Sequence, residues 1–185
     1  AKIAGIKMCQ SYSNQFGVDY RSIMPTNLYG PGDNYHPENS HVIPGLIGRF
    51  HEAKKLKSKK VVIWGSGKPK REFMYVDDMA RACIFLMSME ENEYKSYLPN
   101  DVSHVNVGTG KDHTIHDLAY LIRRVTGFNG TLEFDSSKAD GTPQKLLNID
   151  LLNSMGFKNQ TSLDEGLKKT YKHFLKEIEL SKLRL

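Results

Sequence analysis

Hydrophobic residues recur at helical spacing from the start of the chain. Over residues 2–16 the apolar side chains fall three or four positions apart, which predicts an amphipathic helix, and Gly17 is suited to cap its C-terminus. No capping residue precedes Lys2, so we expect this helix to continue upstream and the chain to be part of a longer protein. Residues 20–24 then favour a buried strand that ends at Pro25.

Helix and strand signals alternate along the rest of the chain. Asp77, Thr114 and the Ser162–Glu165 capping box mark helix starts, and residues 91–101 favour a polar loop. The remaining pattern predicts helices over 44–57, 78–90, 115–126, 150–155 and 163–181, and strands over 61–64, 71–76, 104–107 and 131–134. This alternation predicts the α/β class, and the few scattered strands suit a smaller lobe built onto a larger parallel sheet.

The stretch from Pro25 to Phe50 interrupts this pattern with prolines, glycines and closely spaced polar side chains. Proline fixes φ and glycine permits positive φ, so we expect a shaped loop here, followed by a helix that starts near Pro44. A long loop without its own secondary structure in a compact domain is usually a binding loop or disordered. The aromatic and proline content favours binding.

Composition narrows the possible functions. The net charge of +5 fits an anionic small-molecule ligand and also permits weak, salt-sensitive nucleic-acid binding. The lysine-rich run over residues 54–60 is more typical of a solvated helix end than of a nucleic-acid patch. Two isolated cysteines give no disulfide framework and favour a reducing cytoplasm, and no apolar run reaches transmembrane length.

His41 is the strongest candidate for acid–base chemistry, because it lies between a polar loop and a predicted helix start. A histidine there can exchange protons near neutral pH, although a purely structural hydrogen bond explains it equally well. Arg49 lies about two turns further along the same helix face, and Arg71 follows a glycine turn. Arginine suits phosphate recognition. For each of these two arginines taken alone, the alternative interpretation is a charge on the surface that binds no ligand. Trp64 is either core filler or a stacking wall for a ligand.

Two other patterns carry little weight. Neither Gly65-Ser66-Gly67 nor Gly108-Thr109-Gly110 has the third glycine of a dinucleotide-binding fingerprint, so both are interpreted as turns. His113 and His116 lie three apart near a helix start, which could resemble a metal pair, but two histidines alone do not make a ligand set. We therefore interpret them as surface histidines and expect no metal site.

Four strings taken together resemble the GDP-L-fucose synthase branch of the extended short-chain dehydrogenase/reductase family. They are PTNLYGPGDNYHPENSHVIPGLI over 25–47, WGSGKPKREFMYVDDMA over 64–80, HVNVGTG over 104–110 and DGTPQKLL over 140–147. The resemblance runs in the same order from Lys2 to about Leu175. Several of these strings are specific to this branch, whereas NVGTG and the YVDD-type string are shared more widely among nucleotide-sugar epimerases and dehydratases.

The resemblance implies the C-terminal part of such an enzyme, comprising the edge of a Rossmann sheet and a smaller substrate-binding lobe. Residues 1–40 would belong to the NADP-binding domain and residues 41–185 mainly to the substrate lobe, with some segments returning to the first. The implied reaction converts GDP-4-keto-6-deoxy-D-mannose to GDP-L-fucose, by epimerisation at carbons 3 and 5 and NADPH-dependent reduction at carbon 4. A ketone acidifies the protons on both neighbouring carbons, so one acid–base pair can invert both through an enolate.

The resemblance also implies roles for individual residues. Lys2 matches the lysine of the YxxxK motif, which binds the nicotinamide ribose and lowers the pKa of the motif's tyrosine by adjacent positive charge. His41 matches the acid of the epimerisation and a cofactor contact. The remaining matches are Pro25, Thr26, Asn27 and Leu28 along the cofactor, Arg49, Trp64, Arg71 and Asp140 at the substrate, and Lys145 near the substrate.

The matching tyrosine, serine, cysteine and glycine-rich loop would all lie upstream of residue 1, so we expect this chain alone to be inactive. Members of the family are commonly cytoplasmic homodimers that pair beside the YxxxK helix, which places residues 2–16 at such a contact and implies neither a membrane nor a nucleic-acid partner. One alternative is another nucleotide-sugar epimerase or dehydratase of the same superfamily. A second is a non-catalytic nucleotide-sugar binding lobe, and a basic nucleic-acid module is the least favoured because no aromatic stacking platform accompanies the lysines.

Overall fold

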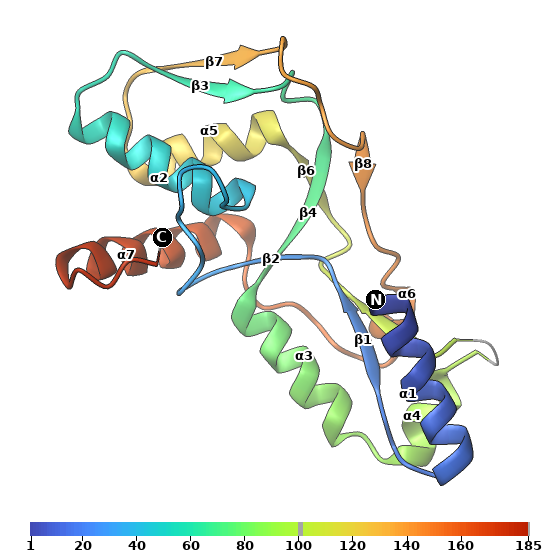
Figure 1. Ribbon diagram of the computed structural model, residues 1–185. Coiled ribbons are helices and arrows are strands. Elements are labelled where there is room, and N and C mark those ends of the chain that lie inside the picture. The colour runs from blue at the N-terminus through green and yellow to red at the C-terminus, as the bar shows by residue number, and fades with distance from the viewer. Residues whose placement is uncertain (100–101, 185) are drawn as a thin grey trace.

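The computed structural model describes residues 1–99 and 102–184 (Figure 1). Its helices are α1 (Lys2–Phe16), α2 (Val42–Lys55), α3 (Val76–Ser88), α4 (Glu91–Tyr97), α5 (Ile115–Thr126), α6 (Asp150–Ser154) and α7 (Leu163–Glu179). Its strands are β1 (Ser22–Pro25), β2 (Asn27–Tyr29), β3 (Lys60–Trp64), β4 (Lys70–Tyr75), β5 (His104–Val107), β6 (Asp112–Thr114), β7 (Thr131–Asp135) and β8 (Gln144–Lys145). The predicted α/β class is confirmed.

Strand β4 connects the two halves of the molecule. Its end at Phe73–Tyr75 pairs in parallel with β2, and its start at Lys70–Glu72 pairs with β6 in antiparallel and with β8 in parallel. Two further pairs, β1–β5 and β3–β7, are also parallel. In Figure 1, β3 and β7 lie above β4 and β1 lies below it. Three segments that are distant in the sequence, β2, β6 and β8, are thereby brought together around one strand.

Two hydrophobic clusters flank β4. The first gathers α2, α5 and α7 beneath β3, with Ile47, Phe50, Leu118 and Ile122 fully enclosed. The second gathers α3 and α6 around β5, and here Val105 and Val107 have no exposed surface. In Figure 1 these clusters correspond to the upper and lower parts of the ribbon. Burial of apolar area at both places supplies the main driving force for folding of this chain.

Several predicted helix boundaries are confirmed by the backbone. Gly17 adopts the left-handed conformation at φ 67° after α1, where glycine carries no steric penalty. The Thr114 side chain accepts the backbone N–H of Asp117 at the start of α5. Ser162 likewise accepts from Glu165 at α7, but the Glu165 carboxylate pairs with Lys169, so only half of the predicted capping box is formed.

Three predictions about secondary structure are wrong. Residues 27–29 form β2 instead of loop, because β4 offers them a parallel ladder. Residues 91–97 form α4 instead of a polar loop, because Tyr94 is buried in the second cluster and this packing overrides the polar composition. Positions 100–101 of the predicted loop lie outside the described residues. Asp77 is no cap, since α3 starts one residue before it.

The predicted strand over 20–24 also differs from the structure. Tyr20 is 55% exposed and the strand begins at Ser22, with half-buried rather than buried side chains. The pairing with β5 on one edge still holds it in place. Among the described helices, none combines the length and apolarity needed to cross a bilayer.

Candidate functional site

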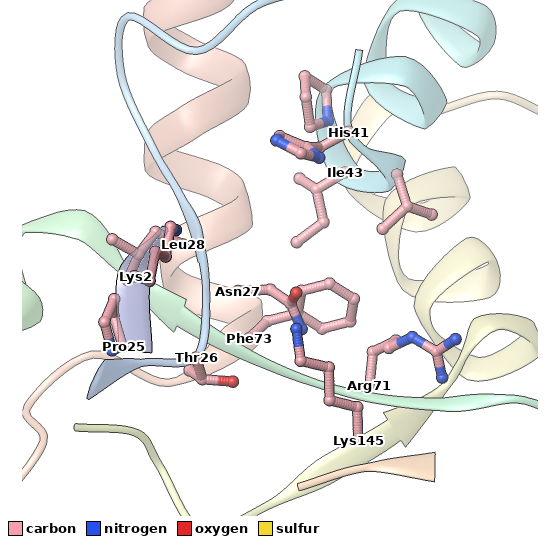
Figure 2. A pocket seen from close by; sticks show the side chains of 12 residues that line it. Lys2, Pro25, Thr26, Asn27, Leu28, His41, Ile43, Arg71, Phe73 and Lys145 are labelled. Carbon is pink, nitrogen blue, oxygen red and sulfur yellow. The ribbon is translucent and has the colours of Figure 1, made fainter. Parts of the chain in front are cut away.

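A cavity of 580 Å³ lies where α1, the β1–β2 junction, α2, β4 and β8 converge. Its lining residues are Lys2, Pro25, Thr26, Asn27, Leu28, His41, Val42, Ile43, Pro44, Arg71, Phe73 and Lys145. The structure thus brings together every residue assigned to the cofactor by the resemblance, and two of those assigned to the substrate. Figure 2 shows Lys2 and Pro25 on one side, Arg71 and Lys145 on another, and His41 facing them.

We call Lys2 and the Pro25–Leu28 segment the first wall. The turn between β1 and β2 is fixed by the Thr26 backbone N–H, which donates to the Val107 carbonyl at 3.0 Å. The Thr26 hydroxyl and the Asn27 side-chain amide both donate to the backbone carbonyl of Glu72, at 3.2 and 2.7 Å. The first wall is therefore attached to β5 and to β4 at once, which sets its position relative to the opposite side of the cavity.

We call Arg71, Phe73 and Lys145 the second wall. Strand alternation places Arg71 and Phe73 on the same face of β4, and the β4–β8 register sets Lys145 beside Arg71. The Arg71 guanidinium donates to the Lys70 carbonyl at 2.7 Å, and no carboxylate in the described part of the chain pairs with it. Two side chains that carry positive charge therefore stand next to each other without a protein counter-ion.

His41 stands at the N-cap position of α2, where its carbonyl accepts the backbone N–H of Gly45 at 2.9 Å. Its side chain caps no helix N–H, and its exposed imidazole borders the large cavity. The preceding loop is built by local bonds, since the His36 ring accepts the backbone N–H groups of Glu38 and Asn39, both at 3.1 Å. The structure thus gives His41 no capping role and leaves it facing the cavity.

A second cavity of 270 Å³ continues from His41 along α2 to the end of β3. Arg49 and Trp64 line it, and the Arg49 guanidinium lies 5.0 Å from the centre of the Trp64 ring. Trp64 is 63% exposed, so the core-filler alternative is excluded. The Lys138 ammonium lies 5.9 Å from the same ring. An exposed indole with cations nearby can offer a flat, electron-rich surface to a ligand.

Asp140 lies outside the lining of both cavities, against the turn that follows Trp64. Its carboxylate accepts the Ser66 hydroxyl at 2.6 Å and the Ser66 backbone N–H at 2.8 Å. These bonds hold the pKa of Asp140 below its usual value, so the group is ionised at neutral pH. The next residue, Gly141, leaves room for the Arg71 guanidinium, which sits 3.1 Å from where a Cβ would be. Asp140 therefore shapes the rim between Trp64 and Arg71.

The charge of the large cavity follows from its lining. Lys2, Arg71 and Lys145 contribute cations, and none of its lining residues is acidic. Such a surface suits an anionic ligand that carries phosphate groups, because arginine can bind two oxygens at once and lysine supplies a mobile charge. With His41 available for proton exchange, the same cavity can combine phosphate binding with acid–base chemistry.

The two remaining histidines of the sequence patterns lie apart from this cavity's lining. His116 stacks on Phe134 with ring centres 5.3 Å apart and packs against Tyr120 at 4.6 Å. His113 lies on β6 opposite Arg71. The packing of His116 accounts for its side chain.

Three contributors to the site were not predicted from the sequence. Ile43 and Phe73 provide apolar surface inside the large cavity, and Glu72 fixes the first wall through its carbonyl. Phe73 could have been found from strand alternation, because it lies two residues after Arg71. Glu72 gave no sequence signal, since its contacts come from segments more than thirty positions away in the chain.

Comparison with known proteins identifies related sequences along almost the whole chain. A family model described as the NAD dependent epimerase/dehydratase family matches residues 1–108. The GDP-L-fucose synthase of Escherichia coli (strain K12) is 54% identical over 175 residues, which cover 95% of this chain and 54% of that protein. The chain thus spans about half the length of the curated relatives it matches.

Solved structures resemble the fold with similar coverage. A GDP-6-OMe-4-keto-L-xylo-heptose reductase from C. jejuni superposes with a TM-score of 0.84 at 31% identity, over 96% of this chain and 60% of that one. A GDP-L-fucose synthetase from Naegleria fowleri bound to NADP gives a TM-score of 0.79 at 28% identity, over 95% of this chain and 53% of that one. Both structures contain a larger protein, of which this chain matches one part.

Proposed function

The chain belongs to the NAD dependent epimerase/dehydratase family, and we propose that it is the substrate-side part of a GDP-L-fucose synthase. In this proposal the whole protein converts GDP-4-keto-6-deoxy-D-mannose to GDP-L-fucose by epimerisation at carbons 3 and 5 and reduction at carbon 4. The observation that carries the proposal is the large cavity, where Lys2, His41, Arg71 and Lys145 meet although they come from four separate segments. The named relatives support the choice of substrate and of NADPH.

The first wall fits a nicotinamide cofactor by its chemistry. Lys2 offers an ammonium group for ribose hydroxyls, and the Pro25–Leu28 backbone forms an edge held rigid by Glu72 and Val107. When bound there, NADPH would supply the hydride for the 4-keto group. The role of Lys2 is to orient the ribose and to stabilise negative charge on the neighbouring phenol of the YxxxK tyrosine.

The second wall and the smaller cavity fit the nucleotide sugar. Arg71 and Lys145 hold the diphosphate, while Trp64 and Arg49 border the nucleotide end. Asp140 shapes the rim beside them through its bonds to Ser66. His41 lies between the two cavities, where it returns a proton to carbon 3 or carbon 5 of the enolate. A general acid at this place contributes about a hundred- to ten-thousandfold to the rate.

The proposal extends to the division and assembly of the protein. We assign residues 1–40 to the end of the NADP-binding domain and residues 41–185 mainly to the substrate lobe. Helix α1 supports a homodimer contact, because Ile3 and Met8 are 75% and 60% exposed on it. Cys9 and Cys83 are both unpaired, which favours a cytoplasmic location.

The deciding experiment is His41→Gln in the full-length protein, with product analysis in deuterated water. Glutamine keeps the size and hydrogen bonding of the side chain but cannot exchange protons near neutral pH. We expect deuterium incorporation at carbons 3 and 5 to fall about a hundred- to ten-thousandfold. NADPH binding should change far less, because glutamine keeps a hydrogen-bonding group where His41 contacts the cofactor and the variant leaves the first wall intact.

His116→Gln is the matched control, because this histidine lines neither cavity. It should form product at the wild-type rate. If His41→Gln labels both carbons as fast as wild type, His41 is not the acid and the assignment is wrong. Steady NADPH consumption by the wild type separates the proposed enzyme from a 4-epimerase or dehydratase, which needs no external reductant, and from a lobe that only binds.

A further inference from the structure

Glu72 is a charged residue buried in the middle of β4. Its exposure is 0%, and no cation in the described part of the chain forms an ion pair with it. Burying an unpaired charge costs several kcal/mol unless hydrogen bonds compensate for it. The contacts of this carboxylate therefore show what the fold uses it for.

The carboxylate of Glu72 accepts three backbone N–H groups from two separate segments. Oε1 accepts from Thr109 at 2.5 Å and from Gly110 at 2.7 Å, in the turn after β5. Oε2 accepts from Leu147 at 3.1 Å, two residues after Lys145. Gly108 lacks a Cβ that would collide with Oε1, so the turn can approach this closely. One side chain thus joins two loops across β4.

The backbone of the same residue connects to the first wall. As described above, the Glu72 carbonyl accepts the Thr26 hydroxyl and the Asn27 amide. The adjacent residues, Arg71 and Phe73, point to the opposite face of β4 and line the large cavity. Glu72 is therefore linked to both walls, by its carbonyl to the first and by its carboxylate to the segment that carries Lys145.

We propose that Glu72 is a positioning residue for the nucleotide sugar, which acts through Leu147 to hold Lys145 beside Arg71. Its carboxylate fastens the segment just after the β4–β8 ladder that pairs Lys145 with Arg71, and its carbonyl sets the first wall, so the side chain and the backbone have separable effects. This inference rests on the proposed function for the identity of the ligand. The attachment of the 145–147 segment to Glu72 is independent of which ligand binds.

Glu72→Gln separates the two effects. A glutamine oxygen can still accept from Thr109 and Gly110, but its NH2 group then faces the Leu147 N–H, so this bond is lost while the Glu72 carbonyl is retained. In the full-length protein we expect the KM for GDP-4-keto-6-deoxy-D-mannose to rise about tenfold. The KM for NADPH should stay within about twofold, because the first wall keeps its bonds.

Asp78→Asn is the matched control. Asp78 is also 0% exposed and also accepts two backbone N–H groups, from Gln160 at 3.1 Å and Thr161 at 2.9 Å. It differs from Glu72 in that it also forms an ion pair with Arg81. It lines neither cavity. Its replacement should lower the thermal midpoint and leave both KM values within about twofold of wild type. A general loss of stability would raise no KM selectively, so the contrast isolates positioning from folding.

A double-mutant cycle tests whether Glu72 acts through Lys145. If it does, Glu72→Gln and Lys145→Ala should be strongly non-additive, and the double variant should resemble Lys145→Ala alone. If the increases in substrate KM caused by the two single substitutions instead multiply in the double variant, Glu72 does not act through Lys145. Should Glu72→Gln fail to fold, replacing Leu147 by its α-hydroxy acid deletes the N–H donor while keeping every side chain, and the same selective rise in substrate KM is expected.

Amide hydrogen exchange keeps the inference separate from the proposed function. Without any ligand, the Leu147 amide should exchange faster in Glu72→Gln than in wild type, whereas the Thr26 amide should not. If the wild type does not turn over the nucleotide sugar, the proposed function is wrong. The exchange rate of the Leu147 amide then decides by itself whether Glu72 positions the 145–147 segment. Unchanged exchange at Leu147, or equal changes in both KM values, would overturn it.

Discussion

The two walls of the large cavity adjoin helices that differ strongly in burial. The first wall starts from α1, a helix with no buried residue, on which Ile3 is 75% and Phe16 is 59% exposed. The second wall faces α2, which buries six residues, among them Ile47 and Phe50 with no exposed surface. The second wall is thus carried by a core that this chain builds itself, whereas the first wall is held by hydrogen bonds and by Leu28, which packs only partly buried against the second cluster.

The two walls therefore differ in how strongly the fold stabilises them, as well as in the ligand that each binds in the proposed function. The hydrogen bonds from Thr26 and Asn27 to Glu72 order the first wall locally, but each contributes only about 0.5–1.5 kcal/mol. The packing beneath α2 contributes about 1.5–3 kcal/mol for each large apolar side chain that it encloses. We therefore expect changes in the core to affect the second wall first.

The largest effect should come from equal truncations on the two helices. Phe50→Ala removes an enclosed ring that packs against Phe128 at 5.6 Å, which should lower the free energy of unfolding by about 3–5 kcal/mol. Phe16→Ala removes an exposed ring from α1, and its effect should stay within about 0.5 kcal/mol. Urea denaturation of the 185-residue chain measures both. Similar losses for the two variants would contradict the contrast between the walls.

A smaller effect should come from the charge of the second wall. Arg71→Ala in the full-length protein should weaken nucleotide-sugar binding roughly ten- to a hundredfold, as expected for the loss of a charge-assisted contact of about 1.5–3 kcal/mol. Arg71→Lys should recover only part, because a point charge cannot bind two oxygens at once. Calorimetry with the nucleotide sugar and with NADPH gives both affinities, and NADPH binding should change little.

The matched control is Arg124→Ala, since Arg124 pairs with Asp164 on a surface outside both cavities. It should leave the nucleotide-sugar affinity unchanged. If Arg71→Ala also leaves that affinity unchanged, Arg71 is a surface charge and the second wall is misassigned.

The sequence predicted those elements of the fold whose signals are local. The caps at Gly17 and Thr114 were found because a cap depends on residues within one turn. Helix α4 was missed because its polar sequence is held by Tyr94, whose partners lie in the second cluster. Strand β2 was missed because its ladder depends on β4, more than forty residues away. Local patterns carry no information about such distant partners.

The candidate site was likewise predictable from the sequence only in part. The resemblance named Lys2, His41 and Arg71 one by one, but nothing in the spacing of these residues implied that they line one cavity. Their meeting depends on the pairing of β4 with β2 and β8. Glu72 was missed for the same reason, since an isolated glutamate in a strand is uninformative until its distant donors are known.

The smallest effect concerns His51 on α2. Its Nδ1 lies 3.1 Å from the Tyr171 hydroxyl, and its ring meets Phe174 edge-on at 5.1 Å. Burial lowers the pKa of His51 below its ordinary value of 6.5, with a smaller opposing effect of Glu52. The folded state therefore binds a proton less readily than the unfolded state when the pH falls.

The sign of the pH effect follows from this shift. Well above pH 6.5 the imidazole is neutral in both states, so its contribution to stability is fully present. As the pH falls through about 6.5, the unfolded state takes up a proton first, and stability falls. In His51→Gln the free energy of unfolding should decline less steeply as the pH is lowered from about 7.5 to about 5. Residues 1–17 contain no histidine, so hydrogen exchange of the α1 amides, after correction for the intrinsic rate, should show no matching change. If the free energy of unfolding of His51→Gln depends on pH as steeply as that of the wild type, protonation of His51 does not destabilise α2. A fall in pH would then affect the two walls equally.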